Sequence, residues 1–269
     1  MKKSIVFILF PVALFSCKKE VSLPEYNVDP VVTAYLSPGI AFSLLLAHQQ
    51  STSSETFSGP SLDSLDITVT SNDTVYHLTS KGNGVYTDSE LILRAGNKYD
   101  LQFAYNNKVV TASTVIPLKP ASVTQSATEI SIKQVTSSTT TTFPPPAQAD
   151  PVTLTWSNDD ASYYLIVVQN LEKNPIRVID TTSTSADTTL IFRNRPTISA
   201  SEDINTRSFT YFGRHRIVLF HINPDYASLY DNSSSNSQNL STPSTGINNG
   251  VGIFTGINSD TLYLQVDKQ

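Results

Sequence analysis

The sequence predicts an all-β protein with two consecutive β-sandwich domains, the first immunoglobulin-like and the second fibronectin type III-like, after a lipoprotein signal peptide. Three observations support this prediction. Ser and Thr make up about a quarter of the 269 residues, and only 15% are charged; Thr favours strands, and Ser disfavours helices. Apolar and polar residues alternate over short stretches. Turn residues separate these stretches roughly every 8–12 residues, as is typical of a β-sandwich.

Residues 1–16 form the predicted signal peptide. Two lysines precede an apolar core, Ile5–Phe15, which is shorter than the roughly 20 apolar residues of a transmembrane helix. The core ends at Ser16-Cys17, and Cys17 is the only cysteine of the chain. This arrangement is typical of a lipobox, in which the cysteine receives a diacylglyceryl group and the signal peptide is cut in front of it. We expect lipidation at Cys17 and a tether over residues 17–29.

The first sandwich is predicted over residues 30–118. Turn signals such as Asn72-Asp73 and Asn106-Asn107 divide it into short strands. The expected strands are Val31–Leu36, Ile40–Ala47, Leu65–Val69, Val75–Thr79, Val85–Tyr86, Leu91–Leu93, Tyr99–Tyr105 and Val109–Val115. A polar loop, Gln49–Pro60, interrupts them. The Pro-containing segment Ile116–Pro120 marks the boundary.

The second sandwich is predicted over residues 119–269, with the polar loop insertions Thr136–Ala149 and Ser233–Thr245. One helix is expected at Pro224–Tyr230, with Asn223 as its N-cap. A Trp at the end of Val152–Trp156 is similar to the buried Trp of a fibronectin type III domain. The domain is expected to open with Val123–Val135. The expected strands that follow the first insertion are Val152–Trp156, Tyr163–Val168, Ile176–Ile179, Leu190–Phe192, Arg216–His221 and Leu262–Val266.

The charge balance argues against a nucleic-acid partner. The net charge is −5, and removal of residues 1–16 with Lys2 and Lys3 lowers it to −7. A nucleic-acid-binding domain needs a basic face. We therefore expect no nucleic-acid partner. The lipid at the N-terminus predicts contact with a membrane.

Four segments in order along the mature chain resemble a family of Bacteroidetes outer-membrane lipoproteins, the domain-of-unknown-function 4249 family. They are Val31–Leu36, Gly84-Val85-Tyr86, Gly96–Leu101 and Asn249–Phe254. Members of this family look like accessory proteins encoded beside TonB-dependent receptors. The resemblance implies an outer-membrane location and such a receptor as partner; it leaves open whether the protein faces the periplasm or the cell exterior. It supplies no catalytic residues.

No residue pattern predicts catalysis, a metal site or a cofactor, so we expect no enzymatic activity. The four histidines, His48, His77, His215 and His221, lack metal-site spacing. The carboxylate pairs Asp63/Asp66 and Asp159-Asp160 fit turns better than acid–base catalysis. The glycines of Gly250–Gly256 open no helix, so a bulge or a close backbone approach is the better interpretation.

Two groups of side chains remain as candidates for binding. Arginines cluster around His215, and the interpretation as separate solvated charges competes with an acidic partner. The members are Arg193, Arg195, Arg207, Arg214 and Arg216. Tyrosines occur in clusters, including Tyr163-Tyr164, Tyr211-Phe212 and the pair Tyr226/Tyr230, which shares one face of the expected helix. They serve either core packing or the binding of a partner or sugar.

The function that we expect is that of an outer-membrane lipoprotein acting as a non-enzymatic accessory or binding subunit of a TonB-dependent receptor system. In such a protein the sandwiches form a rigid support, and loops make the contacts. The alternative is a stand-alone surface lipoprotein that binds glycans or peptides. Tyr and Trp clustered on one exposed face would favour this alternative.

Overall fold

The computed structural model describes residues 29–49, 59–136, 150–180, 190–230 and 246–269. They are mostly β-strand and form several sheets with antiparallel pairing, which confirms the predicted all-β class. The predicted signal peptide, Cys17 and nearly all of the tether lie outside these residues, as does most of each predicted polar loop. Within the described ranges, no helix is long and apolar enough to cross a membrane.

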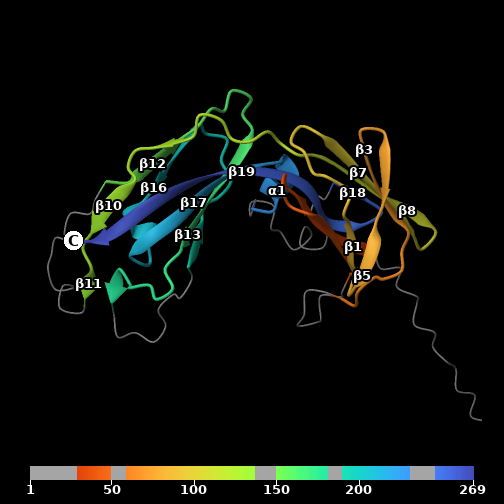
Figure 1. Cartoon of the computed structure of the whole chain (residues 1–269), viewed down its shortest axis with the longest axis horizontal. Helices are drawn as coiled ribbons and strands as arrows, with labels where there is room; N and C mark the ends of the chain where they lie inside the picture. The colour runs from red at the N-terminus through yellow and green to blue at the C-terminus, as the bar shows by residue number, and fades with distance from the viewer. Residues whose placement is uncertain (1–28, 50–58, 137–149, 181–189, 231–245) are drawn as a thin grey trace, which may run out of the picture.

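Nine strands form one long sheet that runs through both halves of the molecule (Figure 1). Its strand order is β15 (Ile191–Arg193), β13 (Tyr163–Asn170), β17 (Gly213–Ile222), β19 (Val251–Lys268), β1 (Pro30–Leu36), β2 (Phe42–His48), β6 (Val85–Asp88) and β5 (Thr79–Gly82), with β10 (Glu129–Ile132) paired to β19.

The last strand, β19, belongs to both halves. Its residues 251–256 pair in parallel with β1, and residues 257–266 pair antiparallel with β17. Figure 1 shows this strand extending between two lobes. We use the term N-terminal lobe for the strands within residues 30–115 together with residues 247–256. We use the term C-terminal lobe for the strands within residues 124–222 together with residues 257–268. The predicted division of the chain into domains stays a prediction; the strand pairing adds that the chain returns to the N-terminal lobe after residue 245.

Smaller sheets accompany the long one. A five-stranded sheet contains β18 (Ile247–Asn248), β8 (Lys108–Val115), β7 (Lys98–Tyr105), β3 (Ile67–Ser71) and β4 (Thr74–His77). A three-stranded sheet contains β16 (Ser201–Ile204), β12 (Val152–Thr155) and β9 (Thr124–Gln125), and a two-stranded sheet contains β11 (Val135–Thr136) and β14 (Ile179–Asp180).

Each lobe has its own hydrophobic core between the long sheet and a smaller sheet. The N-terminal core joins Leu44 of β2 to Leu101 of β7, both 1% exposed or less. The C-terminal core joins Ile217 of β17 to Leu154 of β12, and Trp156 packs there against Tyr164 with 5.3 Å between ring centroids. Because side chains alternate along a strand, every second side chain of the long sheet points away from these cores, to the opposite face.

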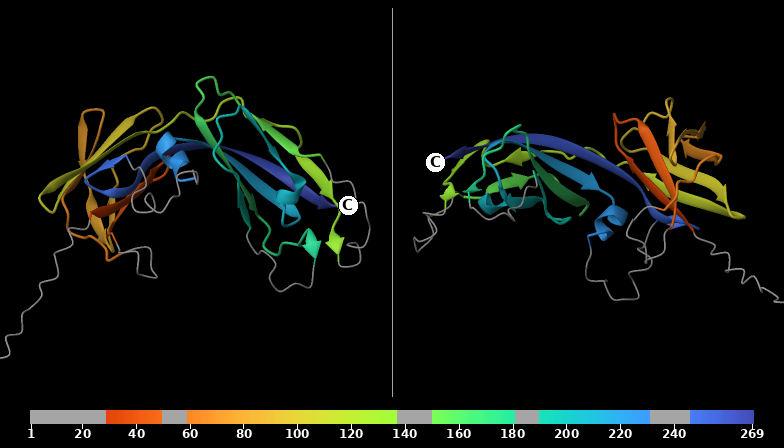
Figure 2. Two further views of the ribbon diagram at one scale, coloured as in Figure 1. Left: turned by 180° about the vertical axis from the view of Figure 1, so that it is seen from behind. Right: turned by 90° about the horizontal axis from the view of Figure 1, so that it is seen from below.

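That other face carries the one α-helix of the described residues, α1 (Pro224–Ser228), near the middle of the molecule (Figure 2). The helix confirms the prediction at this position. Its N-cap residue, Asn223, makes no capping hydrogen bond. The Asn223 amide instead donates to Thr114 Oγ1 and Val115 O in β8, at 3.0 and 2.9 Å.

The start of the connection between the lobes, residues 116–119, is fixed to β17 and β19 by further polar contacts. His221 Nδ1 lies 2.9 Å from Leu118 O, and Asn258 Nδ2 donates to Pro117 O at 2.9 Å. Lys119 Nζ lies 2.8 Å from Asp260 Oδ1. With the continuous strand β19, these contacts hold the two lobes in one arrangement.

Two expectations about local structure have clear outcomes. Leu91 and Leu93 are buried, at 4% exposure each, but form no strand. Their segment is held by side chains instead: Asp88 Oδ1 accepts from Leu91 N at 2.8 Å, and Tyr99 Oη accepts from Arg94 N at 2.8 Å. Alternating burial thus arose without a neighbouring strand, and the prediction of a strand here is wrong.

The glycines of β19 do allow a close backbone approach, as expected. Gly252 has a φ of +113°, and a Cβ there would lie 2.0 Å from Val32 O of β1. A Cβ on Gly256 would lie 2.4 Å from Val115 O. Any side chain at either position would push β19 away from its neighbours.

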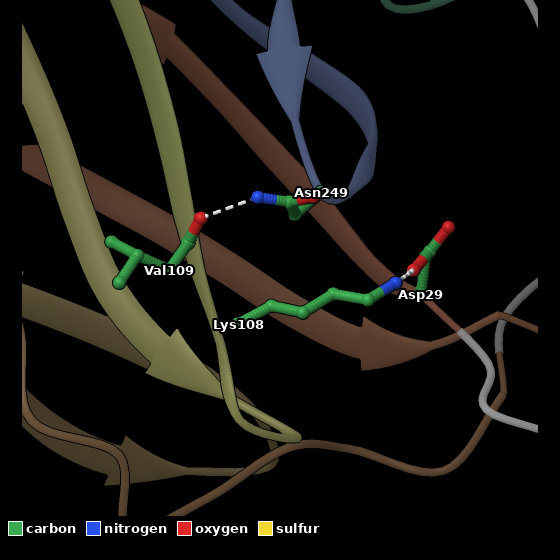
Figure 3. A network of polar contacts seen from close by, with 4 residues as sticks. All are labelled: Asp29, Lys108, Val109 and Asn249. Carbon is green, nitrogen blue, oxygen red and sulfur yellow. Dashed lines mark hydrogen bonds and ion pairs between the residues drawn. The ribbon is translucent and has the colours of Figure 1, made fainter.

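The described chain begins in the N-terminal lobe, whereas the C-terminus lies at the far end of the other lobe (Figure 1). The first described residue, Asp29, pairs with Lys108 at 3.4 Å (Figure 3). Beside this pair, Asn249 Nδ2 donates to Val109 O at 2.8 Å (Figure 3). The start of β1 is therefore held against the β7–β8 hairpin and the turn between β18 and β19.

Candidate ligand-binding groove

An open, tyrosine-rich groove lies beside α1, on the face of the long sheet opposite the two cores. A hollow of about 370 Å³ lies where pairing along β19 passes from β1 to β17. A second hollow, of about 310 Å³, is lined by the helix residues Pro224, Ala227 and Ser228. We call the two together the tyrosine groove. The first hollow is lined by Tyr35, Leu165, Val167, Arg193, Phe220, Ile222, Tyr226 and Ile257, and the second also by Tyr163, Arg195, Pro196 and Tyr230.

Three tyrosine rings meet edge to face along the groove. The Tyr35 and Tyr226 rings have centroids 5.8 Å apart and cross at 87°, and the Tyr226 and Tyr230 rings are also 5.8 Å apart. The Tyr226 and Tyr230 hydroxyls lie 3.5 Å from each other. Tyr35 comes from β1, whereas Tyr226 and Tyr230 follow β17. The groove is therefore formed by segments that are far apart in the sequence. Tyr35 is 45% exposed, and the other two rings are half-buried.

The floor of the groove is apolar. Leu165 of β13 and Ile222 of β17 are each 2% exposed and form a small third cluster with Ala227 of α1. Val167 and Phe220 pack against this cluster. The odd-numbered residues of β13 and the even-numbered residues of β17 point to this side because neighbouring residues of a strand face opposite ways.

A partly buried polar contact fixes the helix on the sheet. Thr255 of β19 is fully buried, and its hydroxyl donates to Asp225 Oδ1 at 2.9 Å. The same carboxylate oxygen accepts from Tyr226 N at 2.8 Å. These two bonds set the position of Tyr226 relative to β19.

Burial dominates the electrostatics of the groove tyrosines. Removal from water raises the pKa of Tyr226 well above its usual range, and the neighbouring Tyr230 hydroxyl raises it further. Burial also raises the pKa of Tyr35, with a smaller contribution from Tyr230. Arg193 is near enough to lower the pKa of Tyr226 slightly. The Tyr35 and Tyr226 phenols, whose pKa values lie above the already alkaline value of an ordinary tyrosine, are protonated at neutral pH and can donate hydrogen bonds.

The arginines predicted to cluster are spread over several places. Arg193 and Arg195 lie at the groove. Arg214 stacks over the Tyr263 ring at 4.5 Å, and Arg216 donates to Gln169 Oε1 at 2.6 Å. Arg207 lines a separate hollow of about 370 Å³ near the buried His215.

The histidines hold local structure. His215 is 3% exposed; its Nε2 lies 3.2 Å from Asn170 Nδ2 and its Nδ1 lies 3.0 Å from Gly213 O. Burial lowers the pKa of this imidazole. His221 stacks on Tyr164 at 4.8 Å, and His48 Nδ1 lies 3.0 Å from Tyr105 Oη. His77 is paired with Asp66 on the surface, at 3.5 Å.

The carboxylate pairs also lie in turns or support them. Asp63 accepts hydrogen bonds from Ser61 Oγ at 3.0 Å and from Gly84 N at 2.9 Å. Asp159-Asp160 lies in a turn, as predicted, and hydrogen bonds from Ser162 lower the pKa of Asp160. Among the described residues, no three His, Cys, Asp or Glu side chains lie close enough together to hold a metal ion.

Sequence reasoning found only part of the groove. The i, i+4 spacing identified Tyr226 and Tyr230 as neighbours on the helix. Tyr35 and Leu165 could not be joined to them, because the contact depends on the pairing of β1 with β19 and of β17 with β13. Arg193 and Arg195 were named, but together with three arginines that the structure places elsewhere, Arg207, Arg214 and Arg216.

The described residues thus define an all-β protein with an open aromatic groove on a two-lobed support. The chain belongs to the family described as domain of unknown function (DUF4249), whose model matches residues 21–262. The match includes both lobes and nearly all of the groove-forming strands. A search of curated proteins gave no match.

Proposed function

We propose that the chain is a non-enzymatic binding lipoprotein of the outer membrane, an accessory subunit of a TonB-dependent receptor that uses the tyrosine groove as its binding surface. The observation that carries this proposal is the set of three tyrosine rings, Tyr35 exposed and Tyr226 and Tyr230 half-buried, in an open groove with a buried apolar floor. Tyrosine offers a large apolar face with one polar end, which suits it to binding surfaces.

In this proposal the two lobes serve as a rigid support for the groove. We interpret the two lobes as two β-sandwiches, an immunoglobulin-like one over residues 30–118 and a fibronectin type III-like one over residues 119–269, with β19 contributing to both. Each lobe has a separate core, and the lobes are connected by a continuous strand and by contacts such as His221 with Leu118 O. A rigid scaffold keeps the groove preformed, which reduces the entropy cost of binding.

A lipid at the N-terminus serves as the membrane anchor in this proposal. Lipidation at Cys17 would connect the membrane to the tether, which enters the folded part at Asp29. The contact of Asp29 with Lys108 fixes this entry point on the N-terminal lobe (Figure 3). The C-terminal lobe would then extend away from the anchor, with the groove between them.

A stand-alone glycan- or peptide-binding lipoprotein is the second candidate. The gathering of Tyr35, Tyr226 and Tyr230 on one open face favours it specifically, because aromatic rings stack on sugars and on peptide side chains. Both candidates use the same groove and differ in whether a receptor occupies or adjoins it.

Affinity purification of the full chain, tagged at its C-terminus, from native outer membranes separates the two candidates. We expect a near-stoichiometric β-barrel receptor by mass spectrometry. Recovery of the lipoprotein alone would contradict the accessory role and favour the stand-alone binder.

A pair of matched variants tests whether the groove makes the contact. Tyr35→Ala removes a ring of the groove, on β1, that is 45% exposed. Tyr263→Ala removes a ring of similar exposure, 47%, that lies outside the groove on β19. We expect Tyr35→Ala to reduce receptor recovery. Tyr263→Ala should leave receptor recovery unchanged, because Tyr263 lies outside the groove. Equal recovery with both variants would exclude the groove as the receptor contact.

The anchor is tested separately. Cys17→Ser should abolish incorporation of a labelled fatty acid and release the protein from the membrane fraction, because acyl chains supply most of the anchoring energy. Retention in the membrane with no label would contradict lipidation at this residue.

A further inference from the structure

The polar groups of the first hollow are hydrogen-bond donors. Tyr35 and Tyr226 line this hollow, and their rings meet edge to face with centroids 5.8 Å apart. The Tyr226 ring also lies 5.8 Å from the ring of Tyr230, which lines the adjoining second hollow. The hydrogen bond between the Tyr226 and Tyr230 hydroxyls is long at 3.5 Å, so these two phenols are poorly satisfied by each other. The Arg193 guanidinium adds a positive charge to the same hollow.

Negative charge is missing from this hollow. Its described lining contains no Asp or Glu. The nearby carboxylate, Asp225, is engaged by Thr255 and by the backbone N–H of Tyr226. Arg193 forms no ion pair within the described residues. The hollow therefore has a positive, donor-rich side and no acidic group of its own to balance it.

The rest of the hollow is hydrocarbon. Leu165 and Ile222 form a dry floor, and Val167, Phe220 and Ile257 surround it. Its volume of about 370 Å³ lies at the lower end of the range of small-molecule sites, roughly 300–1,000 Å³. An apolar body of the size of one aromatic ring and a short chain matches this space.

We infer that the tyrosine groove binds a small carboxylate with an apolar body, whose carboxylate is held by Arg193 and the tyrosine hydroxyls and whose hydrocarbon part covers Leu165 and Ile222. This inference deepens the proposed function and rests on it, since it names the ligand class of the same groove. Guanidinium and phenol donors pair well with a carboxylate, and such charge-assisted bonds are stronger than neutral ones. Tyrosine phenols, with an ordinary pKa of about 10, are protonated at neutral pH, so Tyr35 and Tyr226 can donate hydrogen bonds to the carboxylate.

The test uses the full-length lipoprotein in nanodiscs of phosphatidylethanolamine and phosphatidylglycerol, with empty nanodiscs as baseline. Three probes are titrated by calorimetry: phenylpropionate, its neutral isostere phenylpropanamide, and acetate. We expect saturable binding of phenylpropionate, binding of the amide weaker by about tenfold or more, and none of acetate. Equal affinity for acid and amide, or no binding of either, would overturn the inference.

Two arginine variants locate the site. Arg193→Gln should weaken phenylpropionate binding by about tenfold and leave the weak amide binding unchanged. Arg214→Gln is the matched control, because Arg214 also lies beside a tyrosine, Tyr263, but outside the groove; it should change neither. An equal loss with both variants would assign the effect to general charge and overturn the inference.

A neutral oligosaccharide, cellotetraose, distinguishes this inference from the glycan alternative. If cellotetraose binds and Tyr226→Ala abolishes its binding while phenylpropionate does not bind, the groove is a binding site of another class and the inference fails. Receptor capture from native membranes is measured independently. Loss of capture in Tyr35→Ala without phenylpropionate binding would keep the proposed function and reject only the ligand class.

Discussion

The N-terminal core and the tyrosine groove use the same residue type in opposite ways. In the core, Tyr86 and Tyr99 are fully buried. The Tyr86 hydroxyl donates to Leu62 O at 3.0 Å and accepts from Leu65 N at 3.1 Å. In the groove, the Tyr226 hydroxyl has a 3.5 Å contact with another tyrosine. The comparison teaches that a tyrosine whose hydroxyl is committed to the backbone supports the fold, whereas one left open is available to a ligand.

The largest difference is expected from truncation of the rings. Tyr86→Ala should lower the free energy of unfolding by about 3–5 kcal/mol, because it empties a fully buried site and leaves two backbone groups without partners. Tyr35→Ala should cost about 1 kcal/mol or less, since its ring is 45% exposed. Urea unfolding followed by circular dichroism measures both. Similar losses for the two variants would break the comparison.

Removal of the hydroxyl alone isolates the polar part. Tyr99→Phe should cost about 1–3 kcal/mol, because Arg94 N and Ile92 O lose their common partner. Tyr226→Phe should cost less than about 0.5 kcal/mol, since its hydroxyl contact in the described residues is the long one with Tyr230. The same unfolding assay applies; a larger cost for Tyr226→Phe would mean that its hydroxyl is structural.

Acid should weaken the C-terminal core through His215. Burial lowers the pKa of His215 from the model-peptide value of 6.5, so the folded state prefers the neutral imidazole. The stability that this provides is present above pH 6.5 and is lost as the pH falls through the lowered folded value. His215→Gln should flatten this acid dependence in a series of unfolding curves, whereas His77→Gln, on the surface, serves as the control. An unchanged slope in His215→Gln would show that other groups cause it.

The smallest effect is expected at the alkaline end, in the groove. Burial raises the pKa of Tyr226 above the usual 10.0. The contribution of Tyr226 to stability is therefore complete below pH 10 and is lost as the pH rises towards its raised folded value. Tyr226→Phe should reduce the loss of stability above pH 10 and remove one late-titrating phenol from the ultraviolet titration. A normal titration of all phenols in the wild type would contradict this account.

The fold class and many of the strands could be predicted, because the local sequence alternates between apolar and polar residues where a strand buries one face. The segments Tyr99–Tyr105 and Val109–Val115, joined by Asn106-Asn107, became the β7–β8 hairpin. Leu91–Leu93 shows where this reasoning fails: its two leucines are buried, but its backbone N–H groups donate to the side chains of Asp88 and Tyr99 and not to a neighbouring strand. The polar strand Ser201–Ile204 gave no signal of its own, since it forms by pairing with β12.

The groove was less accessible to sequence reasoning. Tyr226 and Tyr230 were paired by helical spacing, which is a local property. Tyr35 lies nearly 200 residues away in the chain and joins them only because residue 35 pairs with Thr255 of β19. The close backbone approach at Gly252 and Gly256 was predictable, but the partner strands, β1 and β8, were not.

The most direct test of the central claim, that the groove tyrosines are free to bind while the core tyrosines are committed, is fluorine NMR of the full chain labelled with fluorotyrosine in nanodiscs. Phenylpropionate is added stepwise, and signals are assigned with Tyr-to-Phe variants. The account predicts saturable shifts of the Tyr35, Tyr226 and Tyr230 signals and none for Tyr86 and Tyr99. Static groove signals, or equal shifts in the core, would contradict it.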